Sequence, residues 1–131
     1  MRQRVARHQK ERDRSWKTVE APLLLAEAID TNSIKADVIL VDCLTLWISN
    51  LLMASDDPEK IETQIPQLTA VLAKSACPVV VVSNEVGQGI VPENKLARQF
   101  RDLVGYANQA VAACANQVIW TVAGIPVKIK G

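Results

Sequence analysis

The sequence predicts an α/β domain in which a mostly parallel sheet is flanked by helices. Two short runs of β-branched and aliphatic residues, 38–41 and 79–82, are typical of strands covered on both faces of a parallel sheet. Apolar residues at helical spacing lie between the predicted strands, and this alternation implies right-handed crossovers. A length of 131 residues, 49% of them hydrophobic, is sufficient for a single domain over residues 1–131.

Two helical patterns follow the first predicted strand. Asp57-Pro58 has the form of an N-cap with proline at the first helical position, and predicts a helix that runs through Ile61 and Ile65. Pro66 either kinks this helix or divides it in two. The helix before it has its apolar residues at helical spacing, namely Leu44, Trp47, Ile48, Leu51 and Leu52.

A long helix is predicted from Glu93 to about Ala115. Gly105 is its weak point, because glycine is a poor helix former. The residues expected to face inward are Leu96, Phe100, Leu103, Val104, Ala107, Val111 and Cys114.

The C-terminal segment is expected to form two strands, 118–122 and 127–129. Between them, Ala123-Gly124-Ile125-Pro126 predicts a turn. A turn this short is compatible with an antiparallel last strand.

Composition indicates a protein of the cytoplasm. Cys43, Cys77 and Cys114 are odd in number, widely spaced and set among apolar residues, so we expect buried thiols in a reducing compartment. No apolar stretch approaches the roughly 20 residues that span a bilayer, and no apolar segment follows the charged start as it would in a signal peptide.

Positive charge is concentrated at the start of the chain. The whole sequence is nearly balanced, with 15 Lys+Arg against 14 Asp+Glu, which argues against a protein that coats nucleic acid or anionic membranes. Residues 1–20, however, hold seven basic and three acidic side chains. Only Trp16 lies there for base stacking, which disfavours nucleic-acid binding.

The single histidine, His8, lies in this basic segment. Neutral imidazole is a competent nucleophile near pH 7, and neighbouring guanidinium groups would stabilise charge on an attacked phosphorus. The alternative is a solvated histidine on a basic helix.

Polar residues follow two of the predicted strands, at the edge where α/β sheets bind ligands. Asp42 follows residues 38–41, and has the position of a Walker B carboxylate that holds Mg²⁺ beside nucleotide phosphates. The alternative is an Asp that caps the next helix, and both can be true. Ser83-Asn84-Glu85 follows residues 79–82; Glu85 precedes a glycine-containing loop, where it either meets a ligand or faces water.

The Walker B candidate has no phosphate loop with it, because G-x-x-x-x-G-K-[ST] is absent from the sequence. A helix that opens with Arg2, Arg4 and Arg7 places cations at the positive end of its dipole and has no preceding cap. Such a start looks like the middle of an element. We therefore expect that a first strand and a phosphate loop are missing from this chain.

Three segments carry a resemblance to a known family: residues 41–52, 82–94 and 97–102, followed by Gly105 and Asn108-Gln109. They resemble the bifunctional cobinamide kinase / cobinamide-phosphate guanylyltransferases of adenosylcobalamin biosynthesis. The string Asn-Glu-Val-Gly-x-Gly-Ile-Val-Pro is the most specific part. The resemblance implies a P-loop NTPase-like fold, a homo-oligomer, Mg²⁺, and ATP and GTP as substrates together with adenosylcobinamide and its phosphate. From the composition, we expect neither a nucleic-acid partner nor a membrane span.

The family pattern also implies roles for individual residues. His8 falls at the histidine that carries GMP, and the segment after it, Gln9, Lys10, Glu11 and Arg12, resembles the family's GTP-contacting residues. Solvated helix remains the alternative for Lys10 and Arg12. The other expected sites are Glu20 for the guanine nucleotide, with a helix cap as the alternative, Asp42 for Mg²⁺ and nucleotide, and Asn84, Glu85, Arg98 and Arg101 for the substrate side or a subunit interface.

Without a phosphate loop, two interpretations of residues 1–131 stand. The first is an N-terminally truncated, incomplete domain of the bifunctional enzyme. The second is a non-catalytic remnant that binds corrinoid or nucleotide. A phosphate loop supplied by a separate chain is a less economical version of the first.

Overall fold

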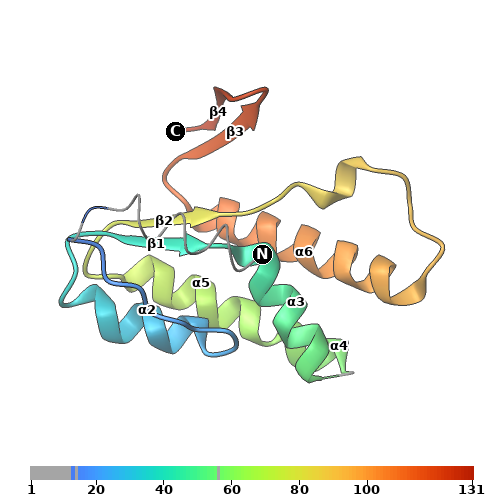
Figure 1. Ribbon diagram of the computed structural model, residues 1–131, viewed down its shortest axis with the longest axis horizontal. Coiled ribbons are helices and arrows are strands. Elements are labelled where there is room, and N and C mark those ends of the chain that lie inside the picture. Colours follow the sequence, from blue (N-terminus) through green and yellow to red (C-terminus); the bar gives the residue numbers. More distant parts are fainter. Residues whose placement is uncertain (1–12, 14, 56) are drawn as a thin grey trace.

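The structure is a computed structural model that describes residue 13, residues 15–55 and residues 57–131 (Figure 1). The expected helix start with Arg2, Arg4 and Arg7 lies outside this part of the chain. In chain order the elements are α2 (Leu25–Ser33), β1 (Ile39–Asp42), α3 (Leu44–Ala54), α4 (Pro58–Glu62), α5 (Gln64–Lys74), β2 (Val79–Val82), the short 3₁₀ helix η1 (Val86–Gln88), α6 (Lys95–Cys114), β3 (Val118–Val122) and β4 (Ile125–Lys130).

Strands β1 and β2 form a parallel pair, which confirms the predicted α/β class. Their register places Ile39 beside Val79 and Asp42 beside Val82, so both carboxyl ends reach the same edge. The connection runs through α3, α4 and α5, as the alternating pattern predicts. Helices α2 and α5 lie along one side of the pair (Figure 1).

The described residues cover one face of the two strands, not both as expected. Val41 is buried, and its neighbours on that face are half-buried, because they pack against the helices. On the other face, among the described residues, Val38, Leu40, Val80 and Val82 are exposed. A continuous apolar run therefore misled the prediction: strand residues alternate between faces, and only the packing decides how many faces are covered.

The helix predicted after Asp57 is divided into α4 and α5. Asp57 is the N-cap of α4, and its carboxylate accepts a hydrogen bond from the backbone N–H of Glu59 (3.1 Å). The division falls at Thr63, three residues before Pro66. Proline has no N–H for the preceding turn, so Pro66 is tolerated in the first turn of α5, where that donor is not needed.

A single core lies between the parallel pair and the helices. On α6, Leu103, Val104 and Ala107 are buried as predicted. Leu96, however, is 58% exposed, and Cys114 is also exposed, because the first and last turns of α6 extend beyond the core. The buried apolar residues are Leu25, Ile29, Val41, Leu44, Trp47, Ile48, Leu51, Leu52, Ile61, Ile65, Leu68, Leu103, Val104 and Ala107.

The cysteines differ from the expectation of buried thiols. All three are free, but Cys43 and Cys77 are only half-buried, and Cys114 is exposed. Burial was predicted because the neighbours of each cysteine in the sequence are apolar. The exposure of Cys114 is set instead by its position in the helix, since it is the last residue of α6.

Strands β3 and β4 form an antiparallel hairpin, which the short turn allows. The predicted turn is too long: Ile125 and Pro126 already pair with β3, so β4 begins two residues before the predicted strand. Ala123 and Gly124 make the turn with positive φ angles of 50° and 77°, which suits a two-residue hairpin connection. The hairpin is a sheet of its own, separate from the parallel pair. It projects away from the helices in Figure 1. Its last strand is tied to the end of α6 by Lys130, whose ammonium donates to the carbonyls of Ala112 and Ala113 (both 2.9 Å).

None of the helices in the described part of the chain is long and apolar enough to cross a membrane.

Candidate functional site at the ends of the parallel strands

The carboxyl ends of β1 and β2 bring together the polar residues predicted there. Asp42 is the last residue of β1 and is exposed. Because it is in register with Val82, the next residues of the second strand, Ser83 to Glu85, continue beside it. The predicted edge therefore exists, and it is open to solvent.

The residues around this edge are joined by a hydrogen-bond network that sequence analysis missed. Thr45, in the first turn of α3, is only 7% exposed. Its hydroxyl oxygen accepts a hydrogen bond from the backbone N–H of Asn84 (2.9 Å) and lies 3.3 Å from the hydroxyl of Ser83. From α6, Asn108 accepts a bond from Ser83 (2.6 Å) and donates one to the carbonyl of Asn84 (3.1 Å).

The helix-cap alternative for Asp42 is wrong. The N-cap of α3 is Cys43, in extended conformation, and no side chain caps the helix. The Asp42 carboxylate has no hydrogen-bond partner within the described part of the chain. Its exposure agrees with a ligand contact at this edge.

The cap alternative for Glu20 is wrong as well. Helix α2 has Leu24 as its N-cap, without a side-chain bond. Glu20 instead lines an open hollow of about 440 Å³ between residues 19–24 and α2. Helix α3 holds this segment, because Trp47 donates to the carbonyl of Leu23 (2.9 Å) and Asn50 to that of Pro22 (3.2 Å).

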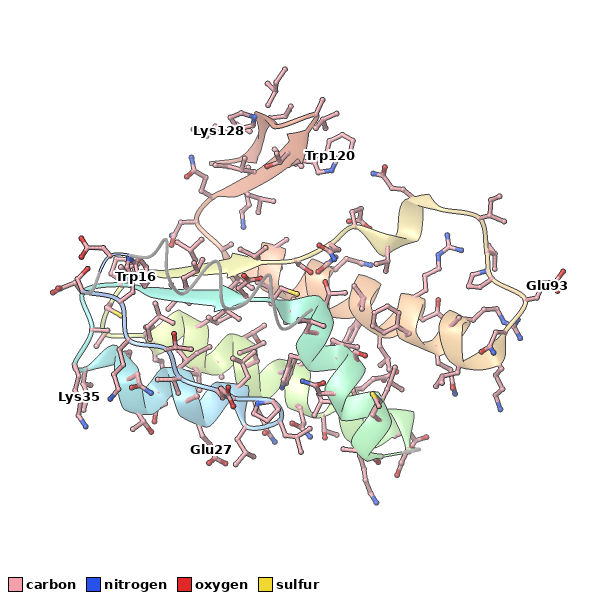
Figure 2. The ribbon with its side chains drawn as sticks, in the orientation of Figure 1. Trp16, Glu27, Lys35, Glu93, Trp120 and Lys128 are labelled. Atoms are coloured by element: carbon pink, nitrogen blue, oxygen red, sulfur yellow. The ribbon has the colours of Figure 1, made fainter. Side chains whose placement is uncertain are left out.

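Arg98 and Arg101 are occupied with the loop that follows the site. The Arg101 guanidinium donates to the carbonyl of Gly87 (2.6 Å), and Arg98 donates to the carbonyls of Pro92 (3.1 Å) and Glu93. Figure 2 shows Glu93 at the outer end of this loop, just before α6. Both arginines thus fasten residues 86–93 to the first turns of α6, a task the sequence did not reveal.

Asn84 and Glu85 lie at the edge with their side chains exposed. The backbone of Asn84 is held on both sides, whereas no described residue forms a hydrogen bond with its side chain or with the Glu85 carboxylate. The expected nucleotide residues His8, Gln9, Lys10, Glu11 and Arg12 lie outside the described residues.

The donor set at the edge fits Mg²⁺. The described residues contain no group of three or more His, Cys, Asp or Glu side chains that would form a complete metal site. Mg²⁺, however, commonly uses one or two carboxylates and completes its shell with water and substrate phosphates. A single exposed carboxylate such as Asp42 meets that requirement.

An α/β chain with an open polar edge at the carboxyl ends of its parallel strands has the architecture of proteins that bind ligands at such an edge. A family model described as cobinamide kinase / cobinamide phosphate guanyltransferase matches residues 1–129. The chain belongs to this family of transferases, which confirms the resemblance seen in the sequence.

Curated relatives match the chain over almost its whole length. The bifunctional adenosylcobalamin biosynthesis protein CobP of Pseudomonas aeruginosa is 39% identical over 131 residues, which covers 100% of this chain and 75% of the relative. The CobU proteins of Escherichia coli and Salmonella typhimurium, with the same description, are 40% and 41% identical over 142 residues. Those alignments cover 99% of this chain and 78% of each relative.

Proposed function

We propose that this chain phosphorylates adenosylcobinamide and then transfers GMP from GTP to the resulting phosphate, as a P-loop NTPase-like, homo-oligomeric enzyme of the cytoplasm. The observation that carries the proposal is the family match over residues 1–129. The exposed carboxylate of Asp42 at the end of β1 supports it, because this is where a nucleotide enzyme of this class holds its metal. Three free cysteines agree with a reducing compartment.

The first proposed reaction is a phosphoryl transfer. The hydroxyl oxygen of the aminopropanol arm of adenosylcobinamide attacks the γ-phosphorus of ATP or GTP. The bond from that phosphorus to the β,γ-bridging oxygen breaks, the nucleoside diphosphate leaves, and the hydroxyl proton passes to solvent. The protein contributes mainly position and charge to such a reaction.

The second proposed reaction passes through His8. An imidazole nitrogen attacks the α-phosphorus of GTP, and pyrophosphate leaves as the P–N bond forms. A phosphate oxygen of adenosylcobinamide phosphate then attacks the same phosphorus, the P–N bond breaks, and adenosyl-GDP-cobinamide is formed. Splitting one difficult displacement into two is the usual benefit of a covalent intermediate.

The remaining nucleotide contacts are assigned by residue type. Lys10 and Arg12 neutralise phosphate charge, with Gln9 and Glu11 as polar contacts in the same segment. Glu20 accepts hydrogen bonds from the guanine edge or ribose, and its place in an open hollow supports this role. Asp42 holds Mg²⁺, which when bound neutralises charge on the phosphates.

The decisive experiment measures the histidine adduct and the kinase reaction on the same preparation. The purified chain is incubated with Mg²⁺ and α-labelled GTP, and its intact mass is compared with that of His8→Ala. We expect an acid-labile GMP adduct on the wild type only. In a parallel incubation with Mg²⁺, ATP and adenosylcobinamide, we expect both proteins to phosphorylate adenosylcobinamide.

Two outcomes would contradict the proposal. If the folded chain binds nucleotide or corrinoid but neither acquires GMP nor forms phosphorylated product, it is the non-catalytic remnant. If the His8→Ala variant still acquires the adduct, another residue is the nucleophile.

A further inference from the structure

The hydrogen bonds around Asn84 form a closed ring, in which the donor and the acceptor of every bond can be assigned. The carbonyl of Asn84 only accepts, so the Asn108 amide nitrogen must face it, and the Asn108 side-chain oxygen must face Ser83. Ser83 has one hydroxyl proton and donates it to that oxygen. The contact between Ser83 and Thr45 therefore requires Thr45 to donate, while Thr45 accepts from the N–H of Asn84.

This ring fixes the main chain on both sides of one α-carbon. The N–H of Asn84 is held by α3 and its carbonyl by α6, two helices that are also packed against each other. The side chains of Asn84 and Glu85 take no part in the ring and stay exposed. An arrangement that fixes a backbone and leaves its side chains available is suited to presenting them to a ligand.

The charge at this edge indicates which ligand they meet. Among the described residues, Asp42 and Glu85 are carboxylates at this edge, while the guanidinium groups of Arg98 and Arg101 are directed to backbone carbonyls of the following loop. Unlike Asp42, to which Mg²⁺ is assigned, Glu85 has no cation assigned to it and would repel a triphosphate, whereas hydroxyl and amide groups would bond to it and to Asn84. The same loop exposes two adjacent apolar side chains, Ile90 (98%) and Val91 (61%), which offer apolar contact to a large ring system.

We propose that Thr45, Ser83 and Asn108 are positioning residues that hold Asn84 and Glu85 for the hydroxyl- and amide-bearing corrinoid substrate, not for the nucleotide. This inference rests on the proposed function. It assigns Asn84 and Glu85 to the corrinoid and adds Thr45 and Asn108, which touch no substrate themselves.

The test compares Thr45→Val with Thr45→Ser in the full chain. Valine has nearly the shape of threonine but no hydroxyl, so it leaves the Asn84 N–H without a partner, whereas serine keeps the ring. We expect Thr45→Val to raise the KM for adenosylcobinamide about tenfold, with the KM for ATP within about twofold of the wild type. Thr45→Ser should restore the wild-type value.

A second variant tests the ring from the other helix. Asn108→Asp still accepts from Ser83 but places a carboxylate oxygen against the carbonyl of Asn84, and it should give the same change in KM for adenosylcobinamide. Amide hydrogen exchange gives a readout independent of activity: the Asn84 N–H should exchange about tenfold faster in Thr45→Val.

The outcomes separate this inference from the proposed function. Equal rises in both KM values, or no rise in either, would overturn the positioning role. If the wild-type chain does not phosphorylate adenosylcobinamide, both the proposed function and the assignment of Asn84 and Glu85 to the corrinoid are overturned. Unchanged exchange at Asn84 in Thr45→Val would overturn the ring itself.

Discussion

Asp42 combines three properties that are rarely found together in a side chain used only for structure. It ends a parallel strand, it is exposed, and within the described residues nothing bonds to its carboxylate. Acidic side chains that lack a structural partner at this edge of an α/β sheet are suited to contact with a metal ion or its bound water.

Replacing Asp42 by Asn keeps the size of the side chain and removes its charge. We expect phosphate transfer to adenosylcobinamide to fall about 100-fold and to need more Mg²⁺, because a charged metal contact is lost. Initial rates measured across a Mg²⁺ titration check this, with Glu93→Gln on the outer loop as a control for removal of an exposed carboxylate. An unchanged Mg²⁺ requirement would remove Asp42 from the metal site.

The candidate site could be predicted from the sequence only where a residue's neighbours in the chain set its position. Asp42 and Glu85 follow strand runs, so the edge could be found before the structure. Thr45 and Asn108 could not, since their bonds join residues 39 and 24 positions apart along the chain. A threonine within an apolar helical stripe is the one local signal that was present.

Helix α6 connects the core to the site. One stripe carries buried Leu103 and Val104, while Asn108 reaches Asn84 and Arg101 reaches Gly87. Its N-terminus is closed by Asn94, whose side chain accepts from the N–H of Ala97 (3.1 Å). Fraying of this end would loosen the arginine contacts to the loop.

Asn94→Ala removes this cap. We expect the free energy of unfolding to fall by about 1 kcal/mol, the usual worth of an N-cap side chain. Urea unfolding followed by far-UV circular dichroism measures the change. Asn94→Asp keeps the acceptor and adds a negative charge beside the helix dipole, so it should retain the stability. Unchanged stability in Asn94→Ala would show that the cap contributes nothing.

Among the secondary-structure elements, the predicted bounds of β2 and β3 agree with the observed ones, and the predicted start of α6 lies two residues before the observed start. Sequence analysis missed α2, which has neither a side-chain cap nor a basic residue in its last turn, and buries only Leu25, Ile29 and Ser33. It also could not predict that, within the described part of the chain, one face of the parallel strands is left uncovered. Those features depend on packing between elements, which leaves little trace in a short stretch of sequence.

The molecule as a whole depends on one continuous core. Ile48 on α3 is fully buried and belongs to the same cluster as Ile65 of α5 and Val104 of α6. A cavity at this point would weaken all three helices together, because close-packed interiors relax only partly around a missing group.

Ile48→Ala should therefore lower the free energy of unfolding by about 2–5 kcal/mol. Thermal unfolding followed by circular dichroism checks this. The matched control is Met53→Ala on the same helix, where an 86% exposed side chain should change stability by less than about 0.5 kcal/mol. Similar losses in the two variants would mean that α3 is not part of the central core.

The β3–β4 hairpin has a consequence for cooperativity. Nearly all its side chains are exposed, and a two-stranded sheet without a covered face is only marginally stable in water. The contacts of Lys130 with the end of α6 hold it in place but bury little apolar surface. The chain is thus expected to be two cooperative units of unequal strength, in which the hairpin opens locally while the helices and the parallel pair remain folded.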